Sequence, residues 1–237
     1  MKWKVALAIL VFAVCGSRAN CAPDAATSAI SKVYSSYRLA LSYLRSGETE
    51  LGGISLATFI DEWSALDKRF AANPPAPFDK DSQFAATLAD VSKHAKDSQE
   101  RLSQGDASGA VAKLEPIRSI LRQMRRRNGI RTLSDCIDNI SAQMDRLQAL
   151  RDAKFDGEDR RQMNAAKETL DSFSPVLRAC KQQSPEANQD QYRRLIKQAS
   201  SSVESAKNAL VTHDTARFIR IVRELRSIDH ILFQQFG

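Results

Sequence analysis

Hydrophobic residues recur every three or four positions through most of this chain. One side of a predicted helix, for example, carries Leu133, Ile137, Ile140, Met144 and Leu147. This spacing is typical of amphipathic α-helices, and no stretch alternates convincingly with the period of two that a half-buried strand requires. Glycine and proline are scarce and mostly lie between the periodic segments, although Pro116 and Pro175 interrupt helix interiors. The pattern predicts an all-α chain with helices at about 24–46, 55–72, 81–104, 106–128, 132–153, 158–182, 188–211 and 214–236.

The segment 105–129 recurs at the end of the chain as 213–237, displaced by 108 positions. Without gaps, Arg118-Ser119-Ile120 aligns with Arg226-Ser227-Ile228, and the neighbouring apolar positions also match. The earlier helices align at a displacement of 107. A near-constant displacement over four helices indicates an internal duplication.

The duplication predicts the domain organisation of the chain. We expect two tandem antiparallel four-helix bundles, one at residues 24–129 and the other at residues 132–237. Each is long enough to bury a hydrophobic core of its own. The connection between them is very short, so the alternative is one long bundle in which the helices of both halves interleave.

The first 19 residues have the features of a secretory signal peptide. A basic start, Met1-Lys2-Trp3-Lys4, precedes an apolar run from Val5 to Cys15. This run is shorter than the ~20 residues that a transmembrane helix needs. Small residues favour cleavage after Ala19, and Ala22 is a second candidate. No later segment is apolar enough to cross a membrane, so we expect a soluble periplasmic or secreted protein.

Charge and residue patterns narrow the functional classes. The formal net charge of +7 falls to +4 without residues 1–19, because that segment carries Lys2, Lys4, Arg18 and no acid. Such a mild excess does not indicate a nucleic-acid-binding protein.

The chain lacks the patterns typical of enzyme sites. A dinuclear metal site in a bundle needs a Glu three residues before a His, and none of the three histidines has one. The sequence also has no CxxC pair, no glycine-rich phosphate loop and no convincing Ser/His/Asp order. We therefore expect no catalytic activity and no metal. The sequence favours a binding or scaffolding protein whose partner is an envelope protein or an anionic surface.

Two cysteines of the mature chain are candidates for a disulfide. Cys136 lies near the start of one predicted helix and Cys180 near the end of the next. These ends are adjacent in an antiparallel hairpin, and an exported protein meets an oxidising environment. The alternative is that both cysteines are small core residues.

A run of arginines closes the predicted helix 106–128 and comprises Arg122, Arg125, Arg126 and Arg127. Cations at this end of a helix complement its negative dipole, which is the commoner reason for them. The alternative is a patch that binds an anionic partner.

The predicted modules resemble the exported four-helix bundles of the cytochrome b562 family. The resemblance is carried by the connection Asn73-Pro74-Pro75 and by the Arg-x-x-x-His motif from Arg226 to His230. Two copies of the module cover nearly all of the mature chain.

This resemblance implies an alternative function, a b-type haem electron carrier that uses the second bundle. In the family, a Met on the first helix and a His on the last bind the iron from opposite faces. The matching residues here are His230 and Met144. The match is incomplete, since Ile140 stands at the aligned methionine position and Arg122 replaces the histidine in the first bundle.

Overall fold

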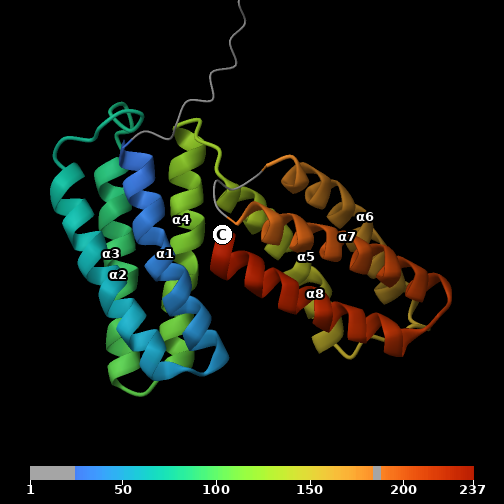
Figure 1. Ribbon diagram of the computed structural model, residues 1–237. Helices are drawn as coiled ribbons and strands as arrows, with labels where there is room; N and C mark the ends of the chain where they lie inside the picture. Colours follow the sequence, from blue (N-terminus) through green and yellow to red (C-terminus); the bar gives the residue numbers. More distant parts are fainter. Residues whose placement is uncertain (1–24, 184–187) are drawn as a thin grey trace, which may run out of the picture.

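The computed structural model of the protein describes residues 25–183 and 188–237 (Figure 1). In these two ranges it contains α-helices and no strand, which confirms the all-α prediction for this part of the chain. The expected signal peptide, residues 1–19, lies outside them. The helices are α1 (Ala25–Ser46), α2 (Thr49–Phe70), α3 (Phe84–Ser103), α4 (Ala107–Arg127), α5 (Leu133–Asp152), α6 (Arg160–Lys181), α7 (Gln189–Val211) and α8 (Thr215–Phe236).

The helices fall into two groups that follow the order of the chain. Helices α1–α4 pack against one another and form the N-terminal group, while α5–α8 form the C-terminal group. Within each group every helix contacts the next, and the first helix also contacts the fourth. Figure 1 shows the C-terminal group inclined to the N-terminal one, and α8 contacts α1.

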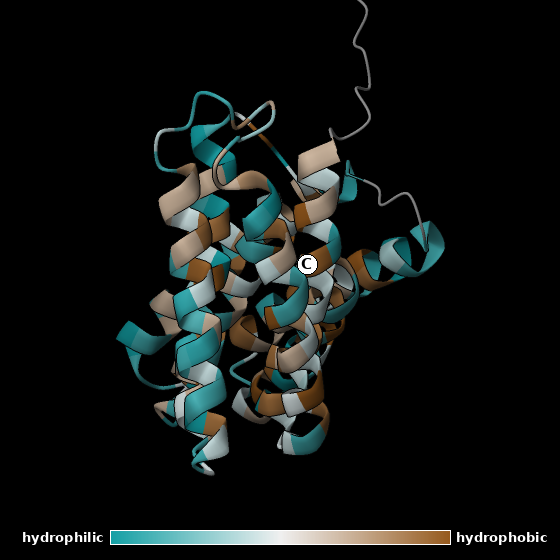
Figure 2. Cartoon of the chain, turned by 90° about the vertical axis from the view of Figure 1, so that its left-hand side faces the viewer, coloured by the Kyte–Doolittle hydropathy of each residue, from teal (hydrophilic) through white to brown (hydrophobic). Residues whose placement is uncertain are grey.

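The core of the N-terminal group is built around a row of aromatic residues in mutual contact. Tyr37, Phe59 and Trp63 are fully buried and lie in a row, with neighbouring ring centroids 5.7 Å apart. The polar atoms at both ends of the row are satisfied, because the Trp63 indole donates to the Leu88 carbonyl (3.0 Å) and the Tyr37 hydroxyl to the Leu114 carbonyl (3.2 Å). The row therefore links all four helices of the group. Figure 2 shows that each helix on this face carries both hydrophobic and hydrophilic residues, as expected of amphipathic helices.

Helix α2 begins at Thr49, six residues before the position that the sequence pattern predicts. Gly52 and Gly53 favour a break in the sequence, but they lie inside the helix. A β-carbon at Gly52 would lie 2.6 Å from the Leu44 side chain, so glycine here permits a close approach of α2 to α1. Tertiary packing outweighs the low helix propensity of glycine at this point.

Corresponding turns of the two groups share a backbone conformation. Gly47 follows α1 and Lys154 follows α5, 107 positions later, and both have positive φ (85° and 57°). Gly105 follows α3 and His213 follows α7, 108 positions later, again with positive φ (78° and 53°). Positive φ is uncommon for residues such as Lys and His. The left-handed turn residues therefore recur at the displacements seen in the sequence.

One end of the C-terminal group is closed by a covalent bond. Cys136 in the first turn of α5 and Cys180 near the end of α6 form a disulfide, with their Cα atoms 5.6 Å apart. That separation lies in the usual range for a disulfide. The Tyr192 hydroxyl donates to the Cys180 carbonyl (2.8 Å), so α7 is attached to the same end.

Candidate functional site

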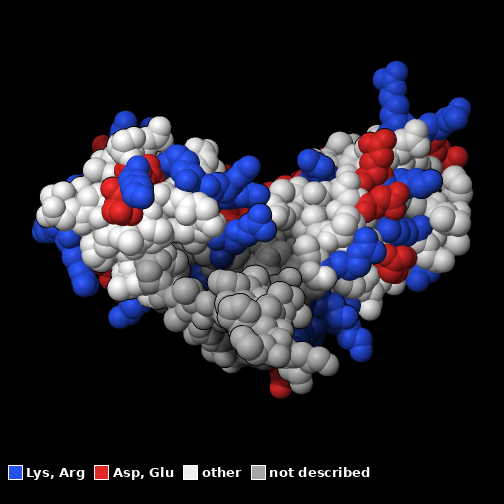
Figure 3. All heavy atoms as spheres, turned by 90° about the horizontal axis from the view of Figure 1, so that it is seen from above, with Lys and Arg blue, Asp and Glu red and all other residues white. Residues whose placement is uncertain are grey.

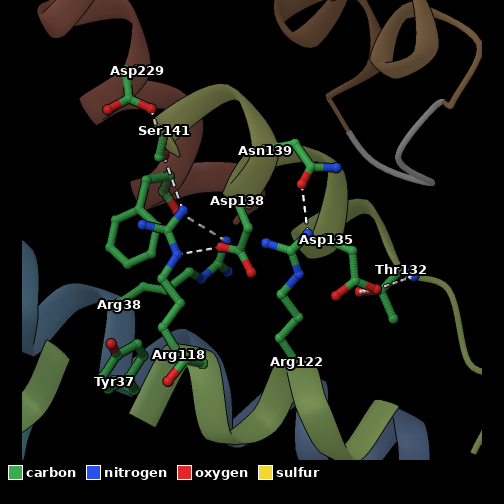
Figure 4. Close-up of polar contacts among 12 residues, drawn as sticks. Tyr37, Arg38, Arg118, Arg122, Thr132, Asp135, Asp138, Asn139, Ser141 and Asp229 are labelled. Atoms are coloured by element: carbon green, nitrogen blue, oxygen red, sulfur yellow. Dashed lines mark hydrogen bonds and ion pairs between the residues drawn. The ribbon is translucent and has the colours of Figure 1, made fainter. Parts of the chain in front are cut away.

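The two helix groups meet through buried charged residues, with Arg118 of α4 at the centre (Figure 4). The Arg118 guanidinium donates to the Asp138 carboxylate on α5 and to the Ser141 hydroxyl (2.9 Å) one turn further along. Its other side lies against the ring of Phe233 on α8, 4.6 Å from the centroid. One side chain of the N-terminal group thus engages two helices of the C-terminal group.

A polar chain continues from Arg118 across the C-terminal group. The Ser141 hydroxyl that accepts from Arg118 donates to Asp229 on α8 (2.6 Å). Asp229 also accepts from Arg226 (3.2 Å), which donates in turn to Asp145 on α5 (2.9 Å). Because Ser141 and both carboxylate oxygens of Asp229 have hydrogen-bond partners, these two buried groups can lie between the helices without a large desolvation cost.

A second set of contacts holds the start of α5 against the end of α4. Arg125 donates twice to Asp135 (2.7 and 3.0 Å) and lies 3.8 Å from Asp138. Arg122 donates to Asn139 (2.6 Å), and Asp135 caps α5 by accepting from the Thr132 amide (2.9 Å). The charges also suit the helix dipoles, since arginines lie at the end of α4 and aspartates at the start of α5.

Helices α1 and α8 complete the contact between the groups. Arg38 donates to the Phe233 carbonyl (3.4 Å), and the Ser42 hydroxyl lies 3.0 Å from Nε2 of His230. Ser42 is only 2% exposed. These contacts join α1 to α8, whereas the covalent connection between the groups joins α4 to α5. The two groups are therefore attached at a second place, which fixes their relative orientation.

Burial shifts the titration of several groups at this contact. It raises the pKa of Asp229 above its usual value and lowers the pKa of His230. Burial also lowers the pKa of Arg118, but the adjacent Asp138 carboxylate outweighs this effect, so the pKa of Arg118 is raised. At neutral pH the Arg118 guanidinium is therefore charged and the His230 ring is uncharged.

A cleft of about 990 Å³ opens beside the buried charges. The N-terminal group contributes one wall, with an exposed ion pair between Arg45 and Glu115 (2.9 Å). The C-terminal group contributes the other, with the Arg226–Asp145 pair (2.9 Å). Arg118 belongs to the lining as well. The remaining lining residues are Ser46, Val111, Ser141, Ser227, Asp229, His230, Ile231 and Phe233.

The surface near the contact is basic when viewed from above. In Figure 3 the molecule has two lobes with a hollow between them, and Lys and Arg side chains gather beside that hollow. Positive side chains thus flank the junction of the two groups on this face.

The two predicted haem ligands lie in different surroundings. His230 bonds to Ser42 of the N-terminal group, whereas Met144 lies fully buried in the core of the C-terminal group. Two axial ligands must face each other across one iron. Haem binding by these two residues stays a prediction.

Three of the four arginines in the predicted patch have partners within the protein. Arg122 and Arg125 contact α5, and Arg127 donates to Asp81 (3.1 Å). Arg126 alone of the four is both exposed and not part of these contacts. The binding of an anionic partner by this run stays a prediction.

The apolar pattern did not predict the central residues of the site, because it does not distinguish a buried polar residue from a solvated one. Asp138 and Asp229 are both buried. One signal did exist, because Arg118 and Arg226 are identical at equivalent repeat positions, and apolar periodicity does not explain a shared arginine. Both arginines line the cleft between the two helix groups.

Comparisons with known proteins add no relatives. No protein-family model, no curated protein and no solved structure matches the chain. In the described ranges, no group of three or more His, Cys, Asp or Glu residues is placed to hold a metal ion. The same part of the chain contains no helix long and apolar enough to cross a membrane.

Proposed function

We propose that this chain is an exported, non-enzymatic binding protein made of two tandem antiparallel four-helix bundles, at residues 24–129 and 132–237. The bundles arose by duplication, and their ligand or partner occupies the cleft between them. The observation that carries this proposal is the 990 Å³ cleft, whose walls come from both helix groups. Concave sites between domains are common places for ligands to bind.

The shared turns support the duplication. The left-handed residues Gly105 and His213 each precede a helix-capping aspartate. Asp106 accepts from the amide of Gly109 (2.7 Å), and Asp214 accepts from the amide of Arg217 (2.9 Å). The same backbone conformation and the same cap at equivalent positions are expected of two copies of one module.

The serine hydroxyl groups that could act in catalysis already have hydrogen-bond partners within the protein, which supports a binding role over catalysis. The closest approach to a catalytic pair is Ser42 with His230, but Ser42 is 2% exposed, so a substrate has little access to its hydroxyl. The Ser141 hydroxyl lies between Arg118 and Asp229, which fixes its orientation. These side chains hold the two groups together and leave the open wall of the cleft for binding.

Native mass spectrometry of the chain recovered from its host tests this proposal. The exported chain should begin at Asn20 or Pro23 and carry a bound mass. Ser227→Trp, which fills the cleft from an exposed position on α8, should remove that mass. Ser103→Trp is the matched control, because Ser103 is also exposed on a helix and bonds to a preceding carbonyl, but lies outside the cleft.

Three outcomes would contradict the proposal. The first is a bound mass that survives Ser227→Trp, and the second is the absence of any bound mass. The third is substrate turnover that depends on a particular side chain of this protein.

A further inference from the structure

We propose that the ligand of the cleft is a small organic anion with at least two carboxylate or phosphate groups. This inference rests on the proposed function, since it identifies the chemical class that the same cleft would bind. It follows from the arginines of the two walls and from the exposure of their present partners.

Each wall presents an arginine toward the cleft. Arg45 comes from α1 and Arg226 from α8, so a ligand that engages both would join the two helix groups. The guanidinium group is planar, remains charged at all relevant pH values and binds carboxylate and phosphate groups through paired hydrogen bonds. Two such groups on opposite walls favour a ligand with two oxyanion groups over a monoanion.

Each of these arginines has one exposed carboxylate partner that a ligand can displace, while Arg226 also keeps its bond to the buried Asp229 (3.2 Å). Glu115, which pairs with Arg45, has a side chain that is 51% exposed, and Asp145, which pairs with Arg226, is 65% exposed. Ion pairs this exposed contribute little net stability, because water competes with each partner. An oxyanion on the ligand can therefore replace either carboxylate, which then turns into solvent.

The deeper charges behave differently. Arg118 is bonded to Asp138 and Ser141 and lies against Phe233, and the Asp138 side chain is 5% exposed. Releasing Arg118 would leave a buried carboxylate without its main partner, which is costly. Arg118 therefore shapes the base of the cleft, and the two outer arginines bind the ligand.

Helix α8 adds further positive charge on the same wall. Arg223 is exposed, and its spacing from Ser227 and His230 places it on the face of α8 that lines the cleft. The adjacent Glu224 does not neutralise it from this side, because its carboxylate accepts from Ser202 on α7 (2.9 Å). The apolar lining residues Val111, Ile231 and Phe233 suit the carbon skeleton of an organic anion.

Isothermal titration of the mature chain at low ionic strength tests the inference. The probes are citrate, which offers only carboxylates, and pyrophosphate, which offers only phosphates. We expect at least one of them to bind, and the stronger probe identifies the source of the oxyanions. Arg45→Gln and Arg226→Gln should each weaken binding about 10-fold or more, as expected for a lost charged hydrogen bond. The matched control is Arg217→Gln, an exposed arginine of α8 outside the lining, which should leave affinity unchanged.

Removing the competing carboxylates should have the opposite effect. Glu115→Gln and Asp145→Asn each delete an internal partner of a binding arginine, so both should tighten binding by about two- to fivefold. These exposed substitutions are expected to fold. Arg45→Gln likewise changes an exposed pair, so it carries the test if Arg226→Gln fails to fold.

Three results would overturn the inference. They are the absence of binding by both probes, an equal loss of affinity in Arg217→Gln, and unchanged affinity in Arg45→Gln. A bound mass that disappears in Ser227→Trp, with neither anion binding, would reject the ligand class but retain the cleft. The absence of that mass as well would reject the proposed function too.

Discussion

Replacing Arg118 by methionine should strongly destabilise the contact between the helix groups. The substitution keeps most of the side-chain length but leaves the Asp138 carboxylate, 5% exposed, without its closest partner. Breaking a buried ion pair on one side costs about 3–5 kcal/mol. Arg125, 3.8 Å from Asp138, remains and offsets part of this cost, whereas the lost hydrogen bond to Ser141 adds about 1 kcal/mol. We therefore expect the free energy of unfolding to fall by about 3–5 kcal/mol.

Urea unfolding measures this change with two probes. Trp63 is the only tryptophan in residues 20–237 and lies in the N-terminal group, so its fluorescence reports on that group alone. Circular dichroism reports on all helices. The two transitions should coincide in the wild type and separate in Arg118→Met, because the groups then unfold independently.

Two further variants make the test specific. Arg118→Met combined with Asp138→Leu removes both charges and should recover most of the lost stability. Arg45→Met breaks an exposed pair and should change the free energy of unfolding by less than about 1 kcal/mol. If Arg118→Met also changed it by less than about 1 kcal/mol, with coincident transitions, the junction would not depend on this residue.

Three other predictions follow from particular residues. Reduction of the Cys136–Cys180 disulfide, whose sequence separation is 44, should lower the free energy of unfolding by about 4 kcal/mol in urea titrations, and an unchanged midpoint would contradict this. Burial raises the pKa of Asp229, so the folded protein favours the protonated carboxyl group more than the unfolded chain does. The resulting stabilisation is complete below the unfolded-state pKa of about 3.9 and is lost as the pH rises through the raised folded-state pKa. Asp229→Asn should therefore flatten the decline in urea midpoint as the pH rises above about 4, and parallel pH profiles of variant and wild type would refute this assignment. Protein expressed with haem supplied should show no Soret band that depends on His230, and a band abolished by His230→Ala but retained in His94→Ala would establish the haem function instead.

The helices were largely predictable because each buries one face, and burial imposes a spacing of three or four residues. The main error was the start of α2, where Gly52 was interpreted as a helix breaker. Its role depends on Leu44 of the neighbouring helix, and that approach is a property of the packed pair. Local propensity cannot reveal such a contact.

The junction was much less predictable than the helices. Asp138 lies beside the apolar stripe of α5, and it is buried where Arg118 and Arg125 of the other helix group contact it. The docking of the two helix groups leaves no periodic signal, since a handful of side chains determine it. The repeated arginines Arg118 and Arg226 were the one feature of the sequence that marked this surface.

Amide hydrogen exchange in the presence of citrate or pyrophosphate, whichever binds more tightly, tests the central claim that both helix groups form one binding cleft. The account predicts simultaneous protection of the end of α1 around Arg45 and of α8 between Arg226 and Ile231, with no change at the α6–α7 end of the molecule. Protection confined to one helix group, or located away from these two segments, would contradict it.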